Sequence, residues 1–196
     1  MIATMIHFES HFPLKNTRTH EVCGASAHAF AFALAGQLCS ANGRTALWVR
    51  EAWDGHQINP VGFSSYLDPK HLLIAQAPSH IDVLASTEEA LRSGHVALVI
   101  AQITQPIGLT EGRRLQLAAQ AGNATGLCIL PEGMGNNAAQ TRWHCAPVFD
   151  ESNAAEDSTL QSWKLIKNKS GTLSAWTVKW NAQTRRISVV SPPIQR

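Results

Sequence analysis

The sequence contains no run of 18 uncharged apolar residues, and this absence excludes a helix long enough to span a membrane. Residues 1–20 also lack the basic start, apolar core and cleavage site of a signal peptide. The formal net charge is only +2 over 196 residues, so the chain has no strong basic or acidic bias. These absences predict a cytoplasmic protein, and a hydrophobic content of 44% suits one folded domain.

Cysteine pairs and metal-binding motifs are also missing. The four cysteines stand far apart without a CxxC pair, which in a cytoplasmic chain predicts buried free thiols. None of the nine histidines forms an HExxH pair. The sequence therefore predicts no metal site and no cofactor.

What the sequence does contain is an alternation of short apolar runs with amphipathic stretches. Such alternation is typical of βαβ units and of an α/β domain with a mainly parallel sheet. We expect strands at 20–23, 45–49, 72–75, 96–101 and 125–130, helices at 25–40, 81–92 and 110–121, and a short helical segment at 59–66.

The pattern changes after residue 141. Runs at 142–148, 163–167 and 175–180 are strand-like and follow one another without a helix, so we expect antiparallel strands that extend the sheet. The acidic stretch 150–158 is interpreted as a flexible connection between two of them. Residues 1–18 show no periodicity and are interpreted as a flexible arm, ahead of a single domain that spans 19–196.

The first strand–turn–helix is the place where a phosphate-binding P-loop, G-x4-G-K-[ST], belongs. Counting from Gly24, the second glycine position is Ala29, the lysine position is Phe30 and the hydroxyl position is Ala31. Phenylalanine supplies no charge for a triphosphate, and alanine supplies no oxygen for magnesium. We therefore interpret this loop as degenerate.

The strand at 96–101 should end in the carboxylate that holds the metal ion in a P-loop ATPase. It ends instead in Ala101 and Gln102. Together with the loop, this predicts that the protein is not an enzyme and has no catalytic residue. Glu51, after the second strand, is the single acid in a suggestive place.

Several segments, taken in order, are similar to the RecA recombinase, and a larger set resembles ImuA, a RecA-like accessory protein of damage-inducible mutagenesis. The resemblance covers nearly all of the chain after residue 18. The segments similar to RecA are 21–24, 47–51, 67–69, 89–94 and 167–169, and those that resemble ImuA are 59–62, 67–69, 88–94, 113–119, 141–143 and 163–180.

The resemblance implies a RecA-like three-layer core and a role in SOS-regulated translesion synthesis. The implied partners are an ImuB-like polymerase relative, the error-prone replicative polymerase α subunit and RecA itself. DNA contact would be weak or indirect, because the loops at 104–108 and 131–139 carry no Lys or Arg where RecA places its DNA-binding loops.

Three alternatives remain open. The sequence also resembles the SulA cell-division inhibitor, which itself resembles a RecA core without a P-loop. This second resemblance implies binding to the tubulin-like protein FtsZ. An ATPase with an unusual pocket is the enzyme alternative. The C-terminal region has seven basic residues and no acidic one, and it offers a surface for a partner or for weak DNA binding: Trp163, Lys164, Lys167, Lys169, Lys179, Arg185 and Arg186.

Overall fold

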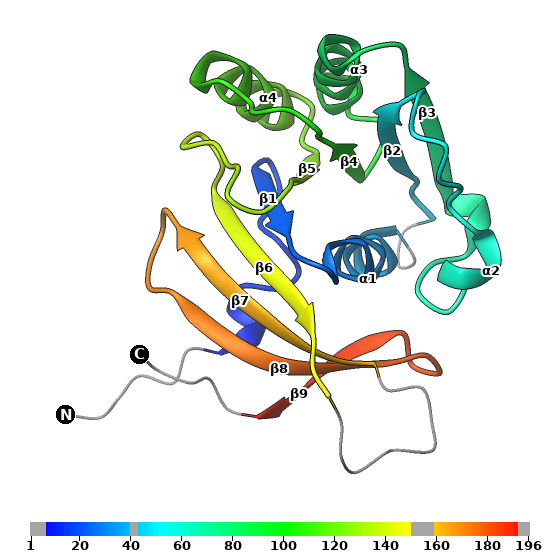
Figure 1. Ribbon diagram of the computed structural model, residues 1–196, viewed down its shortest axis with the longest axis vertical. Helices are drawn as coiled ribbons and strands as arrows, with labels where there is room; N and C mark the ends of the chain where they lie inside the picture. Colours follow the sequence, from blue (N-terminus) through cyan, green and yellow to red (C-terminus); the bar gives the residue numbers. More distant parts are fainter. Residues whose placement is uncertain (1–6, 40–42, 150–158, 192–196) are drawn as a thin grey trace.

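A computed structural model describes residues 7–39, 43–149 and 159–191, and it is built around one nine-stranded sheet (Figure 1). The strands lie in the order β3-β2-β4-β5-β1-β6-β7-β8-β9. The predicted α/β fold, with a mainly parallel sheet extended by antiparallel strands, is confirmed. The predicted connection at 150–158 lies outside the described residues.

The parallel part of the sheet comprises six strands. β1 pairs in parallel with both β5 and β6, and β2 pairs in parallel with both β3 and β4. Their bounds are β1 Thr19–Cys23, β2 Ala46–Glu51, β3 Leu72–Ala77, β4 Leu98–Gln102, β5 Thr125–Ile129 and β6 Thr141–Pro147. Because parallel strands all end at the same edge, the polar groups that follow β1, β2 and β4 meet there.

Helices cover both faces of this parallel part, so the core has three layers (Figure 1). α1 (Ala27–Cys39) and the short α2 (Pro60–Phe63) lie on one face, whereas α3 (His80–Ser93) and α4 (Leu109–Ala121) lie on the other. Each face has its own hydrophobic core. The α1 side is rich in aromatic residues, and the α3–α4 side is built from aliphatic ones.

α3 shows why its sequence forms a helix of this length. The Ser79 hydroxyl accepts a hydrogen bond from the Asp82 backbone N–H at 3.3 Å and so caps the first turn. Gly94 ends the helix in the left-handed region, at φ 68°, where glycine is favoured. A Cβ on Gly94 would lie 2.7 Å from the Gly122 carbonyl oxygen. The ends of α3 and α4 therefore meet through glycine.

Three antiparallel strands complete the sheet. β7 (Leu160–Asn168) and β8 (Ser174–Asn181) correspond to predicted strands, whereas β9 (Arg186–Ser191) was not predicted. Trp176, Val178 and Trp180 share one face and are buried, as their alternation predicts.

The segment before β1 differs from the prediction of a flexible arm. Residues 8–10 form a 3-10 helix, and Phe8, Phe12 and Leu14 are all buried in the α1-side core. The Phe12 ring lies 5.6 Å from that of Phe30 and 5.1 Å from that of Trp163, between ring centroids. The segment is ordered because its aromatic side chains fill the space between α1 and the antiparallel strands.

His20 fixes the start of β1. Its imidazole is 1% exposed, with Nδ1 2.7 Å from the Thr141 hydroxyl and Nε2 2.9 Å from the Lys15 carbonyl oxygen. Burial lowers the pKa of His20 to about 4, so the ring is neutral at pH 7.

The four cysteines are free and buried, which confirms the prediction made from their spacing. No helix in the described part of the chain is long and apolar enough to cross a membrane.

Candidate functional site

The turn between β1 and α1 is short and is pressed against a neighbouring strand. It consists of residues 24–26, and the Ser26 backbone N–H donates to the Cys145 carbonyl oxygen of β6 at 3.0 Å. Gly24 has φ 93°, and a Cβ on it would lie 2.3 Å from the same carbonyl oxygen. Gly24 is thus required by a close approach of two backbones, a reason that involves no ligand.

The remaining residues of the predicted loop lie inside α1. Phe30 is fully buried, with its ring centroid 4.6 Å from that of Trp163 and 5.5 Å from that of Trp143. Ala31 is also fully buried, and Ala29 is half-buried. Phe30, which the sequence predicts at the lysine position of a degenerate P-loop, is therefore a side chain of the aromatic core.

A shallow pocket of about 410 Å³ opens in front of this turn. Gly24, His28, Gln102 and Thr104 line one part of it, and Pro131 and Glu132 line another. No Lys or Arg is among the lining residues, whereas the Glu132 carboxylate is 65% exposed and lies 3.1 Å from Nε2 of His144. A pocket with a carboxylate and no cation repels the phosphates of a nucleotide.

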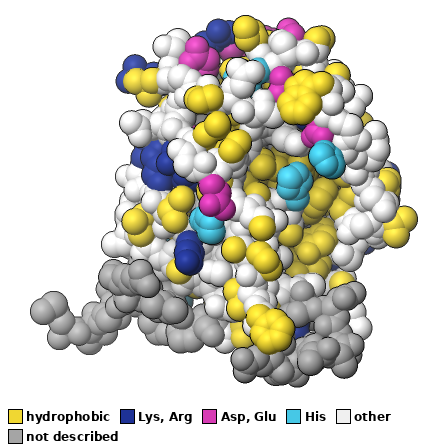
Figure 2. Space-filling model, in the orientation of Figure 1, with side chains coloured by type: hydrophobic (Ala, Val, Ile, Leu, Met, Phe, Trp, Pro, Cys, Tyr) yellow, Lys and Arg dark blue, Asp and Glu magenta, His cyan; other side chains and the backbone are white. Residues whose placement is uncertain are grey.

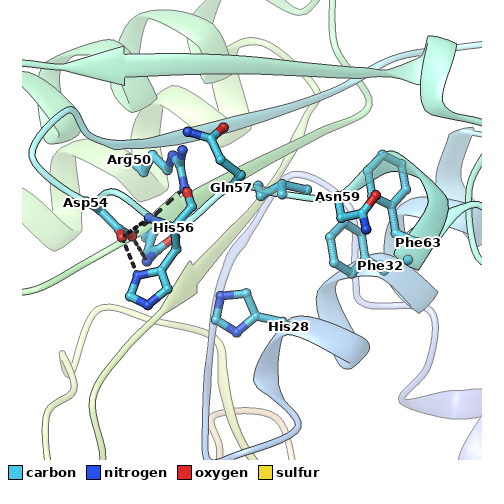
Figure 3. Close-up of a pocket in the computed structure, with 11 residues that line it drawn as sticks. His28, Phe32, Arg50, Asp54, His56, Gln57, Asn59 and Phe63 are labelled. Atoms are coloured by element: carbon cyan, nitrogen blue, oxygen red, sulfur yellow. Dashed lines mark hydrogen bonds and ion pairs between the residues drawn. The ribbon is translucent and has the colours of Figure 1, made fainter.

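A larger cleft of about 500 Å³ adjoins this pocket, and the two share His28 and Gln102. Figure 2 shows it as a hollow with hydrophobic side chains inside and histidines at its rim. Its apolar wall includes Phe32 and Phe63, whose rings stack at 4.9 Å between centroids. Its polar end carries His28, Asp54 and His56 (Figure 3).

Asp54 organises the polar end of the cleft. Its Oδ1 accepts from Nδ1 of His56 at 2.6 Å and from the His56 backbone N–H at 3.0 Å. Its Oδ2 accepts from Nε2 of Gln102 at 2.9 Å, and Gln102 Oε1 accepts from the Trp48 indole N–H at 3.3 Å. The hydrogen bonds from His56 lower the pKa of Asp54, which is therefore ionised at neutral pH.

Two buried charged residues lie at the end of β2, behind this network. Arg50 is 3% exposed; its Nη1 donates to the His56 carbonyl oxygen and lies 4.0 Å from Asp54 Oδ2. Glu51 is 5% exposed and accepts a hydrogen bond from the Thr104 hydroxyl. The acid that the sequence singled out is therefore closed off from the cleft.

His28, from α1, lies at the same polar end of the cleft as Asp54 and His56 (Figure 3). Its imidazole stacks on the Trp48 ring at 5.5 Å between centroids, with an interplanar angle of 20°. Burial lowers its pKa, an effect that the Asp54 carboxylate partly opposes. Sequence reasoning missed Asp54, His56 and Gln102 as a group, although each follows or ends a strand at the carboxyl edge of the sheet.

The C-terminal surface predicted for a partner or for DNA is only partly a surface. Trp163 is fully buried in the aromatic core, so its assignment to that surface was wrong. Lys167 Nζ donates to the carbonyl oxygens of Asn136 at 2.8 Å and Ala139 at 2.7 Å. Lys169 Nζ donates to the Ala138 carbonyl oxygen at 2.7 Å. These two ammonium groups hold the loop at 131–139.

The other predicted cations are spread over the antiparallel strands and their connections. Lys164 is exposed on β7, and Lys179 is half-buried on β8. Arg185 and Arg186 are exposed, and Arg185 donates to the Ser64 carbonyl oxygen at 3.3 Å.

A buried ion pair anchors the loop at 131–139 from the other side. Glu21 is 2% exposed; its Oε2 accepts from Arg142 Nε at 2.7 Å, and its Oε1 accepts from the Asn136 backbone N–H at 2.7 Å. No group of three or more His, Cys, Asp or Glu in the described residues is arranged to hold a metal ion.

Comparisons with known proteins identify the fold. No family model and no curated protein matches the sequence. Among solved structures, the crystal structure of the RadB recombinase is similar to this chain with a TM-score of 0.63 at 13% sequence identity, and the match covers 90% of this chain and 92% of that one. The chain has a RecA-like fold. At this identity the likeness establishes the fold alone.

Proposed function

We propose that this protein is a non-catalytic adaptor with a RecA-like fold, which works through protein–protein contacts in a damage-inducible translesion synthesis complex. The observation that carries the proposal is the β1–α1 junction, where Phe30 fills the aromatic core at the position of the P-loop lysine. A nucleotide at this place would meet the Glu132 carboxylate and no cation. Without a charge partner for the phosphates, the RecA-like frame is left to serve protein contacts.

Two further observations support the absence of ATP hydrolysis. At the end of β4, the Gln102 side chain is held between Asp54 and Trp48. Glu51 is buried against Thr104, so it is not free to activate a water molecule. The acid–metal–water arrangement of a P-loop ATPase therefore has no counterpart among these residues.

The cleft beside the junction supports a role in protein contacts. An apolar wall next to a few fixed polar groups suits the side chain of a partner. Trp53 on the loop after β2 is 69% exposed, and Val61 on α2 is 80% exposed. Exposed tryptophan is enriched among the residues that dominate binding energy at interfaces.

The partners follow from the resemblance to ImuA: an ImuB-like polymerase relative, the error-prone replicative polymerase α subunit and RecA. The test is co-expression of the tagged full chain with each of these three proteins. Stable co-purification with at least one, weakened in a Trp53→Ala variant, is the expected result. Failure with all three would contradict the proposal. Filamentation of cells on overexpression, without co-purification, would instead favour a SulA-like division inhibitor.

Calorimetric titration with Mg-ATP tests the non-catalytic part separately. We expect no heat of binding at micromolar concentrations, because no Lys or Arg lines the shallow pocket in front of the β1–α1 turn. Micromolar binding would revive the ATPase alternative.

A further inference from the structure

A groove of about 410 Å³ runs along α4, between this helix and the loop at 131–139 that joins β5 to β6. Seven residues from three parts of the chain line it: Leu109, Arg113, Gln116, Leu117, Asn137, Ala138 and Lys169. α4 covers the face of the sheet opposite α1 (Figure 1), and no lining residue of the groove also lines the cleft of Figure 3. The groove is therefore a separate surface.

The apolar part of the groove is a stripe along α4. Leu109 is 49% exposed and Leu117 is 63% exposed, and Arg113 lies midway between them in the sequence. Residues four apart share a face of a helix, so the three side chains follow one line, and the two leucines are about 12 Å apart along the axis. Single exposed leucines are common, but two that flank a cation beside a groove form a surface that apolar side chains can cover.

The charged part of the groove is entirely positive. The neighbouring Arg114 forms an ion pair with Glu88 at 2.8 Å, whereas Arg113 is exposed and has no ion pair among the described residues. Lys169 is also exposed; it donates one hydrogen bond to the Ala138 carbonyl oxygen, and its ammonium group has two further donors. No Asp or Glu lines the groove. The groove is therefore complementary to carboxylates.

Its side chains favour a peptide over a nucleic acid. Single-stranded nucleic acid is held by a basic track together with aromatic platforms on which its bases stack. The groove has two leucines and no aromatic residue. An aliphatic stripe pairs with Leu-like or Ile-like side chains, and a guanidinium binds a carboxylate through two parallel hydrogen bonds.

We propose that this groove docks a short, extended segment of a partner protein, in which apolar and acidic residues take turns at every second position, along the side that faces the groove. Its carboxylates would bind Arg113 and Lys169, and its apolar side chains would cover Leu109 and Leu117. Two apolar residues four positions apart in an extended segment are separated by about 13 Å, which matches the spacing of the leucines. The inference rests on the proposed adaptor function and names one of its docking surfaces.

The test is fluorescence anisotropy with the full chain and a short fluorescein-labelled peptide. In this peptide, an aspartate stands midway between two leucines that are four positions apart, and a glutamate follows two positions after the second leucine. Saturable binding below about 1 mM is expected, weakening as salt screens the charges. Arg113→Glu and Leu117→Ser are expected to weaken binding at least about tenfold, the size of a truncated interface hot spot. Both side chains are exposed, so circular dichroism should show that the variants fold.

Matched controls make the same changes elsewhere. Lys164→Glu reverses an exposed charge on β7, and Ile81→Ser removes an apolar side chain that is 75% exposed on α3. Both should bind the peptide within about twofold of the unchanged protein, because neither side chain lines the groove.

Four results would overturn the inference: no peptide binding at millimolar concentration, equal binding of a peptide with lysines in place of the acids, binding unaffected by Arg113→Glu, or an Arg113-dependent affinity for single-stranded DNA without peptide binding. Peptide binding without co-purification of any proposed partner would count against the adaptor function alone. Co-purification without peptide binding would count against the groove alone.

Discussion

The two hydrophobic cores of this protein are built from different residues. Between the parallel strands and α3–α4, the core consists of Val, Leu and Ala side chains with one cysteine and one isoleucine. On the α1 side, rings from the segment before β1, from α1 and from the antiparallel strands pack together. Phe30 belongs to this aromatic cluster and packs on Trp143 and Trp163. The packing of α1 against the antiparallel extension thus depends on this side chain.

Removing a central ring should have the largest effect. Trp163→Ala deletes a fully buried side chain whose ring contacts those of Phe8, Phe12 and Phe30, and is expected to cost about 4 kcal/mol of unfolding free energy. Urea denaturation measures this. Trp53→Ala, at a side chain 69% exposed, is the control and should change stability by less than about 0.5 kcal/mol. Equal losses in both variants would refute a central role for Trp163.

Phe12→Ala tests whether the segment before β1 belongs to the aromatic core. The side chain is 5% exposed, so its removal is expected to cost about 3 kcal/mol, again from urea denaturation. A flexible arm would give no loss. Ile81→Ala on the exposed side of α3 serves as the control and should be nearly neutral.

The pH dependence of stability should report on His20. Its pKa is lowered from 6.5 to about 4 in the folded protein, so the unfolded chain binds the proton more tightly. The stabilisation is fully present above pH 6.5 and is lost as the pH falls towards 4, amounting to about 2–3 kcal/mol between pH 7 and pH 4.5. Urea denaturation at both pH values measures it. His20→Gln should reduce this difference by that amount, and an unchanged pH profile would contradict the buried neutral imidazole.

The smallest expected loss of unfolding free energy comes from removing the N-terminal cap of α3, on the aliphatic side of the sheet. Ser79→Ala removes the hydroxyl that accepts from the Asp82 N–H and should cost about 1 kcal/mol. Thermal or urea unfolding detects this loss. Ser79→Thr is the matched control, since it keeps a capping oxygen. If the alanine and threonine variants are equally stable, the cap contributes nothing.

The sequence predicted the fold well where the pattern is local. Apolar runs bounded by turn residues identified β1 to β8, because buried strands and covered helices leave a periodic signal. β9 was missed because Val189 and Val190 are adjacent and its pairing with β8 is irregular near that point, so it lacks a clean alternation. The spacing of Phe8 and Phe12 was a signal for an ordered segment that the interpretation of residues 1–18 as an arm overlooked.

The candidate site was harder to predict because its contacts are distant in sequence. Gln102 and Asp54 are 48 residues apart, and only the pairing of β2 with β4 brings them together. Trp163 was assigned to a surface because it stands among lysines in the sequence, but β-strand alternation directs it to the opposite side from Lys164. Whether a ring is buried depends on which layer covers that side.

The four buried cysteines give each core its own chemical reporter. Cys39 lies in the aromatic core and Cys128 in the aliphatic one, and burial raises their pKa values to about 11 and about 12. A thiol that is buried and protonated reacts with an alkylating reagent only when its surroundings open. Alkylation followed by peptide mass spectrometry would therefore measure separately how fast the aromatic core and the aliphatic core open. The measurement uses the natural cysteines and needs no introduced label.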